Sequence, residues 1–177
     1  RELFWSGRPE SAIKEFRRHI EMNAWLQEKS ESMIFIGDCY GALNKVELQA
    51  SWYSKAFFTD NSRRKPLLRL AQFNLHHKNY FGAIAYAKAA MEIPYGEFYA
   101  NDMAEYTNLP EEILYQAYGW VGNIEKAKEH ILNALKYQPG KQNNLRDTKY
   151  YFSYPENYSE GRRGIDELNF LYASSKL

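Results

Sequence analysis

Apolar and small side chains recur along most of this chain at intervals of three and four residues, the spacing of amphipathic helices. Short polar turns separate these stretches, and prolines 66 and 110 stand where the first turn of a helix tolerates them. The pattern predicts helices near 9–23, 27–43, 46–59, 63–78, 80–93, 109–121 and 124–137. Residues 145–152 and 165–173 are further candidate helices, and residues 1–6 are expected to end a helix whose beginning is missing.

Four of the polar turns begin similar segments, which indicates an internal repeat. These segments lie at 7–13, 44–50, 78–84 and 122–128. Their aligned positions 12, 49, 83 and 127 are separated by 37, 34 and 44 residues, and 34 residues is the period of the tetratricopeptide helix pair. Small residues share one face of the helices that begin in two of the segments, so that a neighbouring helix can approach closely. They are Ala83, Ala90, Ala127 and Ala134.

The repeat predicts an all-α fold, a tetratricopeptide-like (TPR-like) right-handed superhelical solenoid of antiparallel helix pairs. A single pair cannot bury its apolar face alone, so the pairs must stack. The repeat domain is expected to span residues 1–152 with about four to five pairs, the first of them truncated. Residues 153–177 form a separate C-terminal segment, for which a capping helix is expected.

The long third step of the repeat places an insertion near residues 95–110. This segment is rich in aromatic residues, namely Tyr95, Phe98, Tyr99 and Tyr106. The rings could form a stacking surface for a sugar or a peptide. Alternatively, the segment could be a loop with one helical turn that folds over the stack and is buried by its own aromatics. The second interpretation is favoured, because a long ordered loop needs apolar anchors.

Charge and composition exclude some partners. The formal net charge is +1 at pH 7, so no strong field attracts nucleic acid. The densest basic run, Arg63-Arg64-Lys65, is expected to be a solvated first turn of a helix. No stretch is long and apolar enough to span a bilayer. The single cysteine, Cys39, is expected to be a buried, small apolar residue in a reducing, cytoplasmic compartment.

The chain shows no pattern typical of catalysis, of a cofactor site or of a metal site. His76 and His77 are adjacent on a predicted helix and point about 100° apart, so they cannot chelate one ion together. No His-Glu-x-x-His, paired-cysteine or phosphate-loop spacing occurs. The sequence therefore predicts a chain with no enzymatic activity of its own, no cofactor and no metal.

Three stretches carry a closer resemblance: residues 32–40, residues 83–104 without 96–97, and residues 110–115. In these stretches the chain resembles the tetratricopeptide tails of bacterial family 2 glycosyltransferases, which follow a nucleotide-sugar-binding catalytic domain. The resemblance covers roughly residues 1–152. It implies a non-catalytic scaffold that binds a protein or a glycan acceptor, as the tail of a glycosyltransferase whose catalytic domain is not in this chain. A free-standing adaptor that binds a peptide in its concave groove is the alternative.

A ligand is expected in the concave groove, which the first helices of the pairs line in such stacks. The candidate groove residues are Ile34, Asp38, Leu68, Gln72, His76, Glu112, Gln116 and Trp120. Some members of the wider superfamily bind the C-terminal carboxylate of chaperones through Lys and Asn at these places. Here Asp38 and Gln72 stand where asparagines would, and Asp38 would repel a carboxylate. We therefore expect no binding of a chaperone tail.

The beginning of the chain suggests self-association. Leu3, Phe4 and Trp5 belong to the helix that is expected to be truncated, so apolar surface is expected at that end of the stack. A large exposed apolar patch promotes association. The sequence is therefore compatible with a homodimer through one end of the stack.

Overall fold

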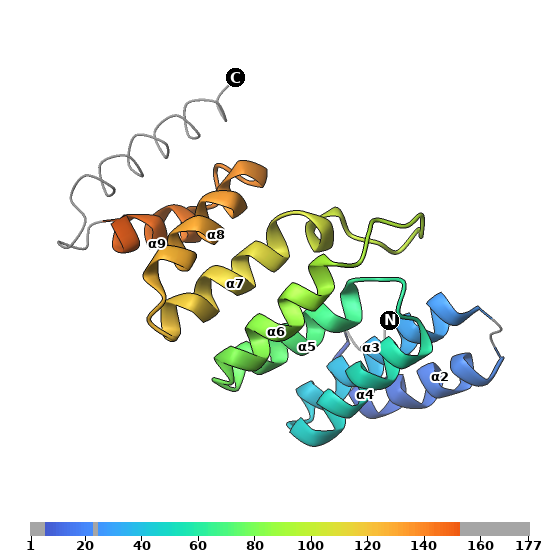
Figure 1. Cartoon of the computed structure of the whole chain (residues 1–177). Coiled ribbons are helices and arrows are strands. Elements are labelled where there is room, and N and C mark those ends of the chain that lie inside the picture. The colour runs from blue at the N-terminus through green and yellow to red at the C-terminus, as the bar shows by residue number, and fades with distance from the viewer. Residues whose placement is uncertain (1–5, 23–24, 153–177) are drawn as a thin grey trace.

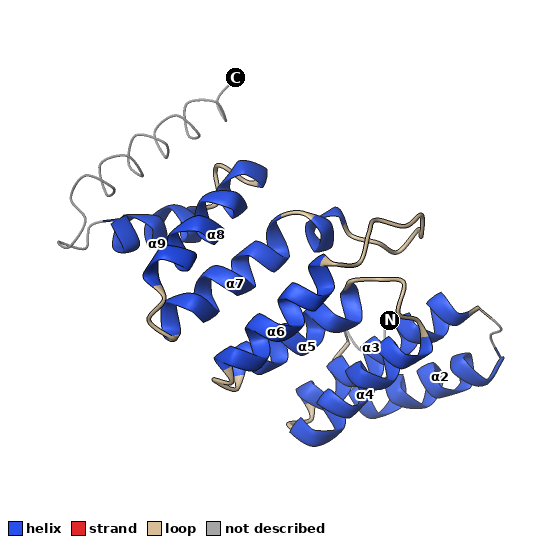
Figure 2. Ribbon diagram, viewed as in Figure 1, coloured by secondary structure: helices blue, strands red, loops and turns tan. Residues whose placement is uncertain are grey.

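The computed structural model describes residues 6–22 and 25–152, and the regular elements of these ranges are helices (Figure 1, Figure 2). The α-helices are α2 (Pro9–Met22), α3 (Leu26–Ala42), α4 (Val46–Thr59), α5 (Lys65–His76), α6 (Tyr80–Met91), α7 (Asn108–Trp120), α8 (Ile124–Tyr137) and α9 (Gln142–Phe152). A short 3-10 helix, η1 (Met103–Tyr106), precedes α7. Each α-helix from α2 to α8 packs against the next one along the chain.

The helices predicted between residues 9 and 137 are confirmed, and each ends within two residues of its expected bounds. Helix α9 begins at residue 142, three residues before the expected start. The truncated first helix, the apolar surface of Leu3, Phe4 and Trp5, and the C-terminal segment with its candidate helix at 165–173 lie outside the described residues. The expected antiparallel pairs are α3 with α4, α5 with α6, and α7 with α8.

Small side chains allow the helices of the stack to approach closely. Ala83, Ala87 and Ala90 on α6 are fully buried, and they belong to a core cluster that also includes residues of α5 and α7. Gly37 of α3 likewise allows α3 and α4 to approach closely. A Cβ atom at position 37 would lie 2.5 Å from Cε1 of Tyr53 on α4, so no larger residue fits there without a shift. The predicted role of small residues is thus confirmed.

The turns inside the three pairs share one backbone geometry, which marks the repeat as clearly as the sequence does. Asn44, Lys78 and Gly122 have positive φ angles of 56°, 61° and 78°. The amide after each of them donates to the carbonyl group five residues before it, which is the Schellman end of an α-helix. These bonds are Lys45 to Tyr40, Asn79 to Asn74 and Asn123 to Tyr118, at 2.8 to 2.9 Å.

Lys78 is the most strained member of this series, because glycine and asparagine enter the left-handed region readily, whereas other residues cost about 1–2 kcal/mol there. We expect Lys78→Gly to raise the free energy of unfolding by about 0.5–1 kcal/mol, because part of the gain is lost to the greater freedom of glycine in the unfolded chain. Urea unfolding monitored by circular dichroism measures this free energy of unfolding. The matched control is Lys14→Gly on the exposed face of α2, which should lower the same quantity by about 1 kcal/mol. Destabilisation by both substitutions would contradict strain at position 78.

Candidate functional site: the groove between α3 and α5

Helices α3, α5 and α7 form one row of the stack, because α3 contacts α5 and α5 contacts α7. They are the first helices of their pairs, and such a row lines the concave face of a TPR-like solenoid. Two neighbouring cavities lie along this row, and both are lined by Arg69 and Gln72 of α5. We call them the groove cavity, of about 380 Å³, and the insertion cavity, of about 200 Å³.

A hydrogen-bonded network lines the groove cavity. The hydroxyl group of Tyr53 donates to Oδ1 of Asp38 at 2.7 Å, and Nε2 of Gln49 donates to the same hydroxyl oxygen at 3.0 Å. Nη2 of Arg69 donates to Oδ2 of Asp38 at 3.4 Å. Burial and the Asp38 carboxylate raise the pKa of Tyr53, so its phenol stays a donor at neutral pH. The cavity thus presents a carboxylate and a guanidinium group side by side.

The structure brings three of the predicted groove residues together, since Asp38, Gln72 and His76 all line the groove cavity. Leu68 lines the insertion cavity, but with 1% of its surface exposed it contributes only an apolar wall. The prediction is wrong for Ile34 as a contact for a ligand. Its side chain is fully buried in the core cluster that runs through the pairs, so a ligand cannot reach it.

The three candidates on α7 do not join this site. Glu112 is buried and bonded internally, with Nζ of Lys141 2.6 Å from its Oε1 atom, so the expectation of a groove contact is wrong there. Gln116 is half-buried and lines neither cavity. Trp120 is 70% exposed and stacks on Tyr80 of α6, with ring centroids 5.6 Å apart. The site that the structure supports therefore lies on α3, α4, α5 and the insertion, and α7 contributes only Leu109 at its first turn.

The insertion folds back over the ends of α3 and α5, and η1 is its helical turn, as the favoured interpretation expected (Figure 1). Tyr95 and Tyr99 are 57% and 72% exposed, so the expected burial by aromatic residues is wrong for these two. The ring of Phe98 lies 4.5 Å from the guanidinium carbon of Arg63, and the ring of Tyr106 lies 4.7 Å from that of Arg64. Arg64 also donates to the backbone carbonyl groups of Ile93 and Met91, at 2.7 and 2.8 Å. Cations at the start of α5 therefore anchor both ends of the inserted segment.

The basic run is not a solvated turn, and that prediction is wrong. Arg63 is 2% exposed, and its Nη2 atom donates to Oε2 of Glu31 at 2.9 Å. Nζ of Lys65 donates to the other oxygen of Glu31 at 2.6 Å. Burial alone would raise the pKa of Glu31, but the two cations outweigh it and hold the pKa below its usual value. The partner carboxylate stands 32 residues earlier in the chain, so local sequence gave no sign of it.

Glu105 of η1 is only partly satisfied. Its side chain is 4% exposed, and its Oε1 atom lies 3.9 Å from Nζ of Lys65. Its Oε2 atom has no hydrogen-bond partner among the described residues. Burial raises the pKa of Glu105 to about 7, against the opposing effect of Lys65 and Arg63. This carboxyl group lines the insertion cavity. Because its pKa is about 7, it is partly protonated near neutral pH.

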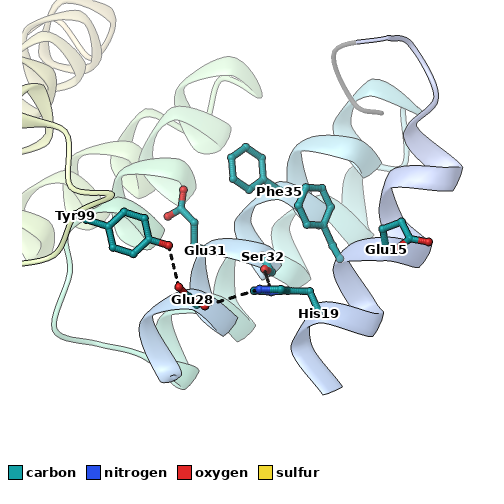
Figure 3. Close-up of a pocket in the computed structure, with 8 residues that line it drawn as sticks. Glu15, His19, Glu28, Glu31, Ser32, Phe35 and Tyr99 are labelled. Carbon is teal, nitrogen blue, oxygen red and sulfur yellow. Dashed lines mark hydrogen bonds and ion pairs between the residues drawn. The ribbon is translucent and has the colours of Figure 1, made fainter. Parts of the chain in front are cut away.

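A third cavity, of about 470 Å³, lies between α2, α3 and the insertion (Figure 3). Phe16 and Phe35 stack along one wall, with ring centroids 5.2 Å apart. On the opposite side the hydroxyl group of Tyr99 donates to Oε1 of Glu28 at 3.0 Å (Figure 3). This bond ties the insertion to the first turn of α3 across 71 residues of sequence.

The third cavity also contains a serine, a histidine and a carboxylate in line, and no local sequence pattern indicated this arrangement. Nδ1 of His19 lies 2.8 Å from Oγ of Ser32, and Nε2 lies 3.8 Å from Oε2 of Glu28 (Figure 3). This order resembles a nucleophilic triad. Ser32, however, lies inside α3, where backbone amides bond within the helix and cannot stabilise an oxyanion. The arrangement fits a link between α2 and α3 better than a catalytic centre.

Other chemistry is sparse in the described part of the chain. Cys39 is fully buried, as predicted, and burial raises the pKa of its thiol to about 11, so it stays an uncharged, unreactive group. Within residues 6–22 and 25–152, no three His, Cys, Asp or Glu side chains gather as metal ligands would. None of the helices described is both long and apolar enough to cross a membrane.

Comparison with known proteins supports the fold. The solved structure of the "MamA RS-1 ArsTM double mutant" is similar to this chain with a TM-score of 0.72, at 14% sequence identity, over 98% of this chain and 90% of that one. MamA is a TPR-like, all-helical protein, and at this identity the likeness concerns the fold alone. No family model matches the sequence, and no curated protein matches it significantly. The chain is therefore an all-α, TPR-like helical solenoid, with the expected fold class confirmed.

The buried carboxyl group of Glu105 predicts a measurable pH dependence of stability. Its pKa rises from 4.5 to about 7 on folding, so its contribution to stability is fully present below pH 4.5 and is lost as the pH rises to 7. We expect Glu105→Gln to raise the free energy of unfolding at pH 8 by at most about 3 kcal/mol, with little effect at pH 4. Chemical unfolding at several pH values measures it. Glu129→Gln, on an exposed site of α8, is the control. Parallel pH profiles for the wild type and the Glu105 variant would contradict the raised pKa.

Proposed function

We propose that this chain is a non-catalytic scaffold that binds an extended segment of a partner protein along α3 and α5. The observation that supports the proposal is the pair of cavities that meet at Arg69 and Gln72, with walls from two consecutive repeats. Side chains with free hydrogen-bonding capacity on such a row can bind the main chain of an extended peptide without one fixed sequence. The likeness in fold to MamA, a TPR-like protein, is consistent with this role.

The charges of the groove cavity favour an internal peptide segment over an acidic tail. Asp38 and Arg69 already form an ion pair there, and Tyr53 donates to the same carboxylate. A C-terminal carboxylate would have to displace Asp38 from Arg69 or lie beside a like charge. An internal segment carries no such charge and needs only hydrogen bonds.

A finer proposal concerns the parent protein, which we propose to be a family 2 glycosyltransferase of the cytoplasm. The support is the resemblance of residues 32–40, 83–95, 98–104 and 110–115 to the tails of that family. The scaffold would then hold a protein or a glycan acceptor for a catalytic domain encoded upstream. The coding sequence upstream decides between this and a free-standing adaptor: a family 2 catalytic domain there supports the tail, and its absence supports the adaptor.

Selection from a phage-displayed library of random peptides tests the proposed groove. We expect peptides enriched on the wild-type chain to lose at least tenfold in affinity for Gln72→Trp, because the indole group fills the space between the two cavities. Fluorescence polarisation with the synthetic peptides measures the affinity.

Glu129→Trp, on the exposed face of α8, is the matched control and should bind the same peptides as the wild type does. Circular dichroism establishes that both variants are folded. Enriched peptides that bind both variants equally, or a library that yields no enriched peptide, would refute a peptide-binding groove between α3 and α5.

A further inference from the structure

Two residues that line the insertion cavity each have a polar atom with no hydrogen-bond partner among residues 6–22 and 25–152. The two atoms are Oε2 of Glu105 and Nε of Arg69, and both atoms are buried. A buried polar atom without a partner costs about 1–3 kcal/mol, so each such atom needs an explanation. One of the two is an acceptor and the other is a donor. Their side chains line the same small space, and Gln72 lines both this cavity and the groove cavity.

Side chains of both charge signs surround this cavity. Lys65 and Arg69 contribute two positive charges, and Asp102 and Glu105 contribute two carboxyl groups. Lys65 and Arg69 would repel a cationic ligand, and Asp102 and the ionised form of Glu105 would repel an anionic one. A neutral group that carries both a donor and an acceptor avoids both repulsions.

The remaining walls are apolar, since Leu68 and Leu109 complete the lining. A volume of about 200 Å³ is smaller than the usual pocket for a drug-sized ligand and suits one side chain. The expected occupant is therefore short, neutral and polar at its tip, with a methylene stem that contacts the two leucines.

We propose that the insertion cavity binds the side-chain carboxamide of an asparagine or glutamine in the peptide segment held by the groove. Both atoms are buried in the unbound structure, so binding requires the two side chains to rotate toward the cavity. The amide nitrogen then donates to Oε2 of Glu105, and the amide oxygen accepts from Nε of Arg69. This inference rests on the proposed function and names one contact by which the groove selects its partner. The insertion then has a role of its own, because it supplies Glu105 and Asp102 to a site whose other polar groups come from α5.

The protonation of Glu105 supplies an independent consequence. Its neighbours are Glu31 on α3, Arg63 and Lys65 at the start of α5, and Asp102 in the insertion. An N–H donor at Oε2 stabilises the carboxylate, so binding lowers the pKa of Glu105 from about 7 and releases a proton. Affinity for a carboxamide is therefore higher at pH 8 than at pH 6.

Nuclear magnetic resonance titration of the whole chain with a small amide tests the inference without any partner peptide. The probe is N-acetyl-glutamine methylamide, and N-acetyl-norleucine methylamide is the apolar control of similar length. We expect saturable shifts of the backbone amide signals of Gln72 and Leu109 with the first compound only. The carbon signal of the Glu105 carboxyl group, followed against pH, should report a lower pKa when the first compound is present.

Two variants identify the contacts. Arg69→Met and Glu105→Met each remove one hydrogen-bonding partner, and each should weaken the probe at least tenfold. The control is Arg146→Met, whose side chain is 73% exposed on α9 and which should leave binding unchanged. The backbone spectrum of each variant shows whether it is folded.

Three outcomes would overturn the inference. The absence of a saturable shift would indicate a site for water only, and equal shifts with the norleucine compound would indicate an apolar void. Unchanged binding in both methionine variants would exclude the proposed contacts. A library that yields no enriched peptide, together with a positive amide titration, would refute the groove and leave the carboxamide site standing. The reverse result would refute the carboxamide site alone.

Discussion

Close approach between neighbouring helices is the constraint on which this fold depends. The helices of a pair can pack tightly only where one of them carries almost no side chain, and Ala83, Ala87, Ala90 and Gly37 supply such positions. Larger residues such as Ile113 and Leu68 then fill the space between pairs. Because each pair leaves an apolar face uncovered, its stability depends on the next pair, and the helices accumulate in chain order.

The insertion adds a second kind of interaction to this apolar stack. Arg63 and Lys65 bind the two oxygens of Glu31, and aromatic residues of the insertion cover the arginines. A buried ion pair of this kind contributes little net stability, because both charges lose their water. It does restrict the geometry, since an arginine that is 2% exposed cannot leave its carboxylate without a large penalty. The ion pair therefore fixes where the inserted segment lies and gives the insertion cavity its charged wall.

The sequence was sufficient to predict the fold, because the repeat consists of local patterns of apolar, small and turn residues. It was sufficient for part of the site: Asp38, Gln72 and His76 share a cavity, since their spacing along α3 and α5 follows from helical geometry. It failed where partners come from different repeats. Nothing near Arg63 indicates Glu31, and nothing near His19 indicates Ser32.

Burial was the other quantity that the sequence could not predict. Ile34 and Glu112 have the helical positions of groove residues, yet both are covered. Whether an inward-facing position is open or covered depends on the size of side chains on the neighbouring helices. Glu105 escaped notice for the same reason, because a carboxyl group in a short loop helix gives no local sign that its surroundings will exclude water.

The loops at the two edges of the stack differ in regularity. The links within the pairs, at 43–45, 77–79 and 121–123, each have three residues and one backbone shape. The links between pairs differ in length, from 60–64 to 92–107, and the latter carries the insertion (Figure 2). Recombination at the uniform edge can add or remove a whole unit without redesign of a loop, whereas the variable edge tolerates new segments. New binding specificity in such a protein is thus expected to evolve through segments inserted in the links between pairs, while the uniform turns within pairs keep the stacking of the helices unchanged.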